Sequence, residues 1–283
     1  MRDVLEALAT WAGADGIGLA TVIDTSQSAP RRPGASLAVH PDGRVIGSVS
    51  GGCVEGAVVE IAQQVMAGAA PSRTRFGITD EQAMGVGLTC GGEIEVFVDV
   101  LSAGDLERIL RARQLVADDE PVAVATVVDG PALHGARIVV TGHDTDGTLG
   151  NEGLDVAVVD DARGMLAQAT TGLRHYGATG QRRLDDVTVF VDVHAPRPRM
   201  YVFGAIDFAA AVARIGRFLD FHVTVCDARK VFATRERFPV ADDVVAEWPH
   251  RFLARAPVDR RTVICVLTHD PKFDVPVLEV ALR

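Results

Sequence analysis

The pattern of the sequence changes at a short segment that holds two prolines, His194-Ala-Pro196-Arg-Pro198. Before this segment, the stretches that predict strands adjoin hairpin turns, and helical patterns separate some of them. After it, short strands alternate with helical stretches, which is typical of a parallel, Rossmann-like sheet. Because proline-punctuated linkers often join domains, we predict two domains, residues 1–195 and 199–283.

The predicted fold class is α/β, with a mixed α+β N-terminal domain followed by a partial Rossmann-like parallel-sheet domain. In the first domain, Asp42-Gly43 between two apolar runs indicates a hairpin of strands 36–40 and 44–49. A helix over 54–66 follows, since its apolar residues have helical spacing. The second domain shows four strands, whereas a full dinucleotide-binding sheet has about six. We find no internal repeat in the sequence.

Composition narrows the functional class. The 283 residues carry a formal net charge of −10, which argues against nucleic acid as the main partner. No apolar run approaches the roughly 20 residues of a membrane span, and the first residues lack a signal-peptide pattern. We therefore expect a cytoplasmic protein. The four cysteines include no CxxC pair, so neither a disulfide framework nor a closed structural zinc site is expected.

Two of the cysteines, Cys226 and Cys265, lie in apolar runs and are expected to be buried strand residues. Cys53 instead follows Gly51-Gly52 at the start of the predicted helix, where free backbone N–H groups attract anions. Such a position lowers the pKa of a thiol and makes it a better nucleophile or metal ligand. The alternative is a glycine pair that starts a helix beside a small, inert cysteine.

Cys90 has the same neighbours in the opposite order, Cys90-Gly91-Gly92. If both cysteines share a pocket, two soft sulfur donors would lie beside one glycine-rich anion site, which suits a phosphorylated ligand that bears a soft metal or sulfur. Arg31 and Arg32, in a proline-rich turn, would add guanidinium groups that pair with phosphate. The alternative for these arginines is a solvated loop.

These residues resemble a known signature. The run from Ser28 to Ala35, the run from Gly43 to Gly56 that contains Gly-Gly-Cys53, and the run from Leu88 to Val96 are similar to the XdhC/CoxI family of xanthine dehydrogenase accessory proteins. Residues 199–205, 225–229, 232–239 and 267–270 resemble the C-terminal Rossmann domain of that family.

The resemblance implies a cytoplasmic chaperone that binds the molybdenum cofactor (molybdopterin), assists its sulfuration and inserts it into a molybdenum hydroxylase of the xanthine or carbon monoxide dehydrogenase type. It implies a cysteine desulfurase as sulfur donor, a homodimer, and Cys53 as the catalytic residue in contact with metal, cofactor or persulfide. The expected metal contacts are Cys53 and Cys90. The expected cofactor-binding residues of the first domain are Arg31, Arg32, Ser50, Gly51, Gly52, Cys53, Glu55, Cys90, Gly91 and Gly92.

The second domain keeps only part of a dinucleotide fingerprint. Gly204 holds the first glycine position, but Ile206 stands where a second glycine would let a pyrophosphate approach the backbone. Asp227 is well placed for a ribose hydroxyl or, alternatively, for a structural cap. Gly204 and Asp227 are therefore candidate NAD(P) or nucleotide contacts. Two rival hypotheses remain: an NAD(P)-dependent oxidoreductase with a reactive cysteine, and an interaction scaffold without a ligand site.

Overall fold

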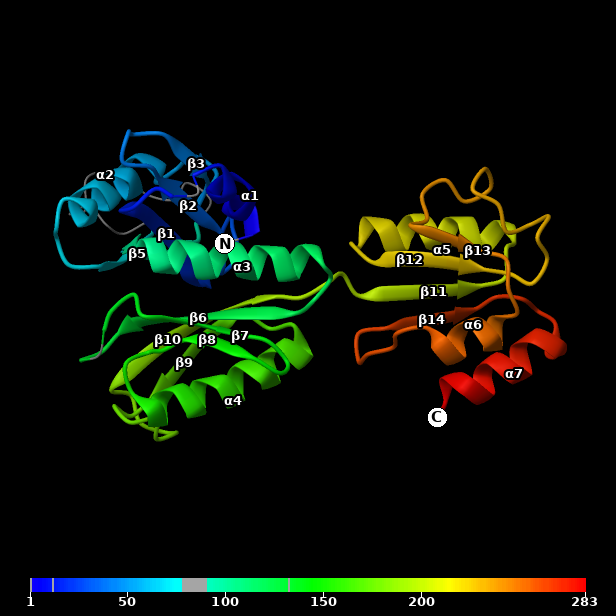
Figure 1. The fold of residues 1–283 in the computed structure, drawn as a ribbon. Coiled ribbons are helices and arrows are strands. Elements are labelled where there is room, and N and C mark those ends of the chain that lie inside the picture. Colours follow the sequence, from blue (N-terminus) through cyan, green and yellow to red (C-terminus); the bar gives the residue numbers. More distant parts are fainter. Residues whose placement is uncertain (1, 12, 78–90, 132) are drawn as a thin grey trace. The chain divides into compact units, whose positions relative to one another are not determined.

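The computed structural model describes residues 2–11, 13–77, 91–131 and 133–283 (Figure 1). The chain forms two compact units, Met1–Pro196 and Arg197–Arg283. The first unit contains antiparallel sheets with helices, and the second contains a parallel sheet. The predicted fold class is confirmed.

The first unit is built from two five-stranded antiparallel sheets that have the same strand order. The predicted hairpin of strands 36–40 and 44–49 is confirmed, because its two strands pair antiparallel. Two further strands, β8 and β9, were not predicted from the sequence. The first sheet runs β3 (Val45–Gly47), β2 (Ser36–Val39), β1 (Ile17–Ser26), β5 (Glu93–Leu101), β4 (Ser72–Phe76). The second runs β8 (Thr145–Gly147), β7 (Arg137–Val140), β6 (Val122–Asp129), β10 (Val187–His194), β9 (Gly172–Tyr176).

Each sheet has two helices at matching places in the chain. Helix α1 (Arg2–Thr10) precedes the first sheet and α3 (Ala103–Ala117) precedes the second, and both contribute to one apolar cluster. Helix α2 (Glu55–Met66) packs on the first sheet, and α4 (Glu152–Gln168) packs on the second (Figure 1). Both halves therefore have the order helix, three strands, helix, two strands.

The first unit thus consists of two structural repeats. Our prediction that the chain contains no internal repeat is wrong. We call residues 2–101 the first repeat and residues 103–194 the second. The repeats share topology and some residue identities, such as Val-Phe-Val-Asp-Val at 96–100 in β5 and at 189–193 in β10. Gly47 and Gly147 are one such pair: both have positive φ, and a Cβ on either would lie 2.3 Å from a backbone carbonyl oxygen of the neighbouring strand.

The two repeats pack against each other through equivalent side chains. Ile23 and Phe97 of the first repeat form one buried cluster with Val128 and Phe190 of the second. Beside this cluster, Arg137 Nη2 donates to Asp99 Oδ2 at 2.6 Å, and both side chains are about 3% exposed. Burial raises the pKa of the Asp99 carboxyl, although the neighbouring Arg137 guanidinium favours its charged form.

The second unit has four parallel strands in the order β13-β12-β11-β14. Helix α5 lies on one side of this sheet, and α6 and α7 lie on the other (Figure 1). This is the partial Rossmann-like sheet that the sequence predicts. The elements are β11 (Arg199–Phe203), α5 (Asp207–Phe218), β12 (His222–Cys226), β13 (Asp243–Val245), α6 (Pro249–Arg255), β14 (Val263–Val266) and α7 (Pro271–Ala281).

Candidate functional site

The strand pairing of the first sheet brings the candidate residues of the first domain to one end of that sheet. Ser26, at the end of β1, pairs with Glu93 at the start of β5. Leu37, near the start of β2, pairs with Gly47 at the end of β3. The connections that carry Arg31 and Arg32, Gly51 to Cys53, and Gly91 and Gly92 therefore leave the sheet on the same side. Cys90 lies outside the described residues.

The loop before α2 folds around the carboxylate of Glu55. The backbone N–H groups of Ser50, Gly51 and Gly52 donate to its two oxygens at 2.8–3.1 Å. The Ser48 hydroxyl donates at 2.7 Å, and the buried Ser50 hydroxyl donates as well. Gly51 and Gly52 have φ of +78° and +121°, a backbone conformation that other residues rarely adopt, which lets successive N–H groups converge.

Glu55 thus fills the anion site that the Gly-Gly-Cys motif predicts. Partial burial is the largest single effect and disfavours its charge, but the hydrogen bonds from Ser50, from Ser48 and from the backbone together outweigh it and lower the pKa of Glu55 to about 2. The role that we expected for the Gly51 and Gly52 amides, binding a phosphate, is taken by this internal carboxylate. The loop is therefore held in one conformation from within.

Cys53 follows this loop directly. Its side chain is half-buried, and it packs against the apolar cluster that α2 forms with the first sheet. Cys226 in β12 is fully buried as predicted, and burial raises the pKa of its thiol to about 12. Cys265 is only half-buried because β14 is an edge strand.

The arginine turn is fixed by two close contacts. A Cβ on Gly92 would lie 2.6 Å from the amide nitrogen of Ala29, so the segment after Cys90 packs against the start of the turn. A Cβ on Gly34, at the end of the turn, would lie 2.7 Å from Oδ1 of the buried Asp192 in the second repeat. Both glycines are needed because the neighbouring groups leave no room for a side chain.

The second repeat has a corresponding connection without the thiol, although α4 begins earlier, at Glu152. Asp155 takes the place of Glu55 and accepts hydrogen bonds of 2.7 Å from the Thr148 hydroxyl and from the Leu149 amide. Gly153 takes the place of Cys53, and a Cβ on it would lie 2.5 Å from the carbonyl oxygen of Thr179. This position of the second repeat is closed by backbone, so the two repeats differ at the residue expected to be reactive.

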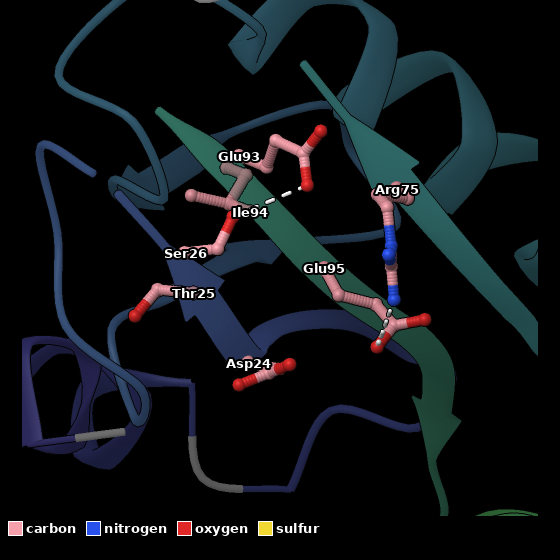
Figure 2. A pocket seen from close by; sticks show the side chains of 7 residues that line it. All are labelled: Asp24, Thr25, Ser26, Arg75, Glu93, Ile94 and Glu95. Atoms are coloured by element: carbon pink, nitrogen blue, oxygen red, sulfur yellow. Dashed lines mark hydrogen bonds and ion pairs between the residues drawn. The ribbon is translucent and has the colours of Figure 1, made fainter. Parts of the chain in front are cut away.

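A small hollow of about 30 Å³ lies beside the start of β5 (Figure 2). Two contacts lie across it: Ser26 donates to Glu93 at 3.1 Å, and Arg75 lies 3.7 Å from Glu95. A space of this size holds about one water molecule. We therefore assign these residues, which the sequence reading missed, to the framework of this end of the sheet. The lining residues are Asp24, Thr25, Ser26, Arg75, Glu93, Ile94 and Glu95.

The glycine loop of the second unit is held by Asp227. This buried carboxylate accepts 2.8 Å hydrogen bonds from the amide of Ala205 and from the amide of Arg229, and the Arg229 guanidinium pairs with both of its oxygens. The carboxylate that we considered for a ribose hydroxyl is thus occupied within the chain. Together with Ile206 at the second fingerprint position, this geometry does not favour a dinucleotide.

Among the residues that the structure describes, no group of three or more His, Cys, Asp or Glu side chains is arranged to hold a metal ion. None of the helices in the same part of the chain is both long and apolar enough to cross a bilayer.

Comparison with known proteins gives several relatives. A protein of Bacillus subtilis (strain 168), named as a probable subunit of xanthine dehydrogenase, is 26% identical over 264 residues, which cover 92% of this chain and 74% of the relative. The molybdenum cofactor insertion chaperone PaoD of Escherichia coli (strain K12) is 36% identical over 94 residues, which cover 33% of this chain and 28% of that protein. A crystal structure of a xanthine dehydrogenase from Bacillus halodurans has a TM-score of 0.65 and 20% identity, covers 98% of this chain and 77% of that one, and shares the fold.

Two family profiles match the sequence, and the residues that they match correspond to the structural units. The profile of the XdhC and CoxI family matches residues 11–77 and 115–177, one stretch in each repeat. The profile of the XdhC Rossmann domain matches residues 200–283, which form the parallel sheet of the second unit. The chain therefore belongs to the XdhC/CoxI family.

Proposed function

We propose that this chain is an accessory protein that binds the molybdenum cofactor, assists its sulfuration and inserts it into a molybdenum hydroxylase. The names of two relatives, a molybdenum cofactor insertion chaperone and a probable subunit of xanthine dehydrogenase, support this role. The proposal includes a cytoplasmic location, a cysteine desulfurase as sulfur donor, and a homodimer. The cofactor is cargo, since a chaperone passes it on.

The observation that carries the proposal is the convergence of three connections at one end of the first sheet. The half-buried thiol of Cys53, the Arg31–Arg32 turn and the Gly91–Gly92 segment all belong to connections at this end of the sheet. A thiol is a soft ligand that suits molybdenum or its sulfur, and guanidinium groups pair with phosphate. The donor set therefore fits a phosphorylated, sulfur-rich cofactor.

The roles within the site follow from the contacts. Cys53 would contact the metal or its sulfur, with Cys90 as a second candidate. Arg31 and Arg32 would hold the phosphate, because the Gly51 and Gly52 amides already donate to Glu55. Ser50 and Glu55 would act indirectly, by fixing the loop that places Cys53.

Cofactor binding by the purified chain tests this proposal. Wild type and the Cys53→Ser variant would be incubated with molybdenum cofactor released from a donor enzyme, and retained molybdenum and pterin would be measured after gel filtration. We expect the wild type to retain both and Cys53→Ser to retain much less. The control is Cys265→Ser, which removes a half-buried thiol from the other unit. Equal retention by Cys53→Ser and wild type would remove Cys53 from the site.

A further inference from the structure

Helix α5 lies alone on its face of the second unit. The connection from β12 to β13 contains no helix, so α5 has no neighbouring helix on this side, while α6 and α7 share the other side (Figure 1). Sheets of this class usually carry helices side by side on both faces. The outer surface of α5 is therefore left without a covering element in the described second unit.

That outer surface is apolar. Phe208 is 69% exposed, Ile215 58% and Phe218 89%, and the adjacent Leu219 is 56% exposed. Their spacing puts these side chains on one face of the helix, with the small exposed Ala211 between them. A contiguous group of large exposed apolar side chains is typical of a protein interface rather than of a free surface.

The charged residues beside this face indicate what covers it. Asp207 and Arg214 are two helical turns apart and lie on the same flank of the apolar face. When a helix pairs antiparallel with its own copy, the same flanks meet in reversed order. Asp207, whose carboxylate also lies 3.6 Å from Arg237, would then face Arg214 of the other copy, and the pair would centre near Ala211, where a small side chain allows close approach.

We propose that α5 is the surface through which this chain pairs with a second copy of itself, the two α5 helices running antiparallel. This deepens the homodimer in the proposed function by naming its surface. The area is of the right order: a specific interface buries at least about 1,000 Å², and the four phenylalanines of the two copies, at about 150–250 Å² each, would supply more than half of that.

Light scattering coupled to gel filtration, across a wide range of protein concentration, tests the pairing on the full chain without cofactor. We expect a wild-type dimer and, for Phe218→Asp, a dimer that is at least about 30-fold weaker, because a large apolar side chain of the interface is replaced by a buried charge. The control is Leu282→Asp, which changes an 85% exposed apolar residue at the end of α7 and should leave the dimer unchanged. Circular dichroism would show that each variant is folded.

A charge exchange tests the antiparallel direction. Asp207→Arg and Arg214→Asp should each weaken the dimer, and the double variant should restore it. A monomeric wild type, a dimer that survives Phe218→Asp, or a double variant weaker than both single variants would overturn the proposal. Since no cofactor is present, these outcomes are independent of cofactor binding at Cys53.

Discussion

At the scale of single residues, Glu55 determines how the candidate site is built. The same sequence feature, paired glycines before a helix, can bind an external anion or an internal one. Here the amides of Gly51 and Gly52 and the hydroxyls of Ser48 and Ser50 all donate to Glu55. The motif therefore gives Cys53 a rigid support, and in the proposed function it is the arginine turn that would bind a phosphate.

The Glu55→Gln variant tests this support through acid stability. The carboxyl has a pKa of about 2 in the folded chain and an ordinary value of 4.5. Its charge thus stabilises the fold fully above pH 4.5, and this contribution disappears as the pH falls towards 2. We expect the free energy of unfolding, measured with urea, to fall less steeply over this pH interval in Glu55→Gln than in wild type.

The matched control for that measurement is Glu60→Gln, which changes an exposed glutamate on the same helix. It should retain the wild-type pH dependence. If Glu55→Gln and wild type lose stability in parallel over this interval, the carboxylate does not hold the loop in solution.

At the scale of elements, the arginine turn is positioned by the segment that leads into β5. Gly92 is buried, and a Cβ there would lie 2.6 Å from the Ala29 nitrogen and 2.7 Å from the Ser28 carbonyl oxygen. Neither backbone group can move without moving the turn. The place of Arg31 and Arg32 is thus coupled to the strand that follows Cys90.

We therefore expect Gly92→Ala to lower the free energy of unfolding by about 1–3 kcal/mol and to weaken cofactor retention. Gly56→Ala is the control: its Cβ meets nothing within 4 Å in α2, so it should stabilise the chain by about 0.5–1 kcal/mol through helix propensity. Urea unfolding measures both changes. A Gly92→Ala chain as stable as wild type would show that the turn is not packed against this segment.

The sequence predicts elements that are set by local patterns, and it misses features that depend on contacts between distant residues. The hairpin around Asp42-Gly43 and the helix that ends at Met66 are local, and both are confirmed. The hydrogen bond from the Gly51 amide to Glu55 depends on the path of the loop. The ion pair between Asp227 and Arg229 depends on a side-chain conformation. Neither is visible as a residue pattern.

At the scale of the whole first unit, two repeats of one topology have taken different roles. Equivalent apolar residues pack them together, and Asp99 with Arg137 forms a buried ion pair between them. The duplication also leaves a trace in the sequence that we missed, because Val-Phe-Val-Asp-Val occurs at both 96–100 and 189–193. Gly47 and Gly147, where backbone approaches closely, are another equivalent pair.

The two repeats differ at the position of Cys53. Where the second repeat has Gly153 beneath the Thr179 carbonyl, the first has the half-buried thiol of Cys53. The duplicated framework thus offers one thiol position of this kind in the described part of the unit. On this ground we propose that the cofactor contacts the chain at Cys53.

The most direct test of this proposal is whether the cofactor protects the Cys53 thiol from alkylation. The chain would be treated with iodoacetamide with and without molybdenum cofactor, and alkylation at each cysteine would be followed by mass spectrometry. We expect the cofactor to slow alkylation of Cys53 and to leave that of Cys265 unchanged. Equal rates at Cys53 with and without the cofactor, under conditions where the chain retains it, would show that the cofactor does not contact Cys53.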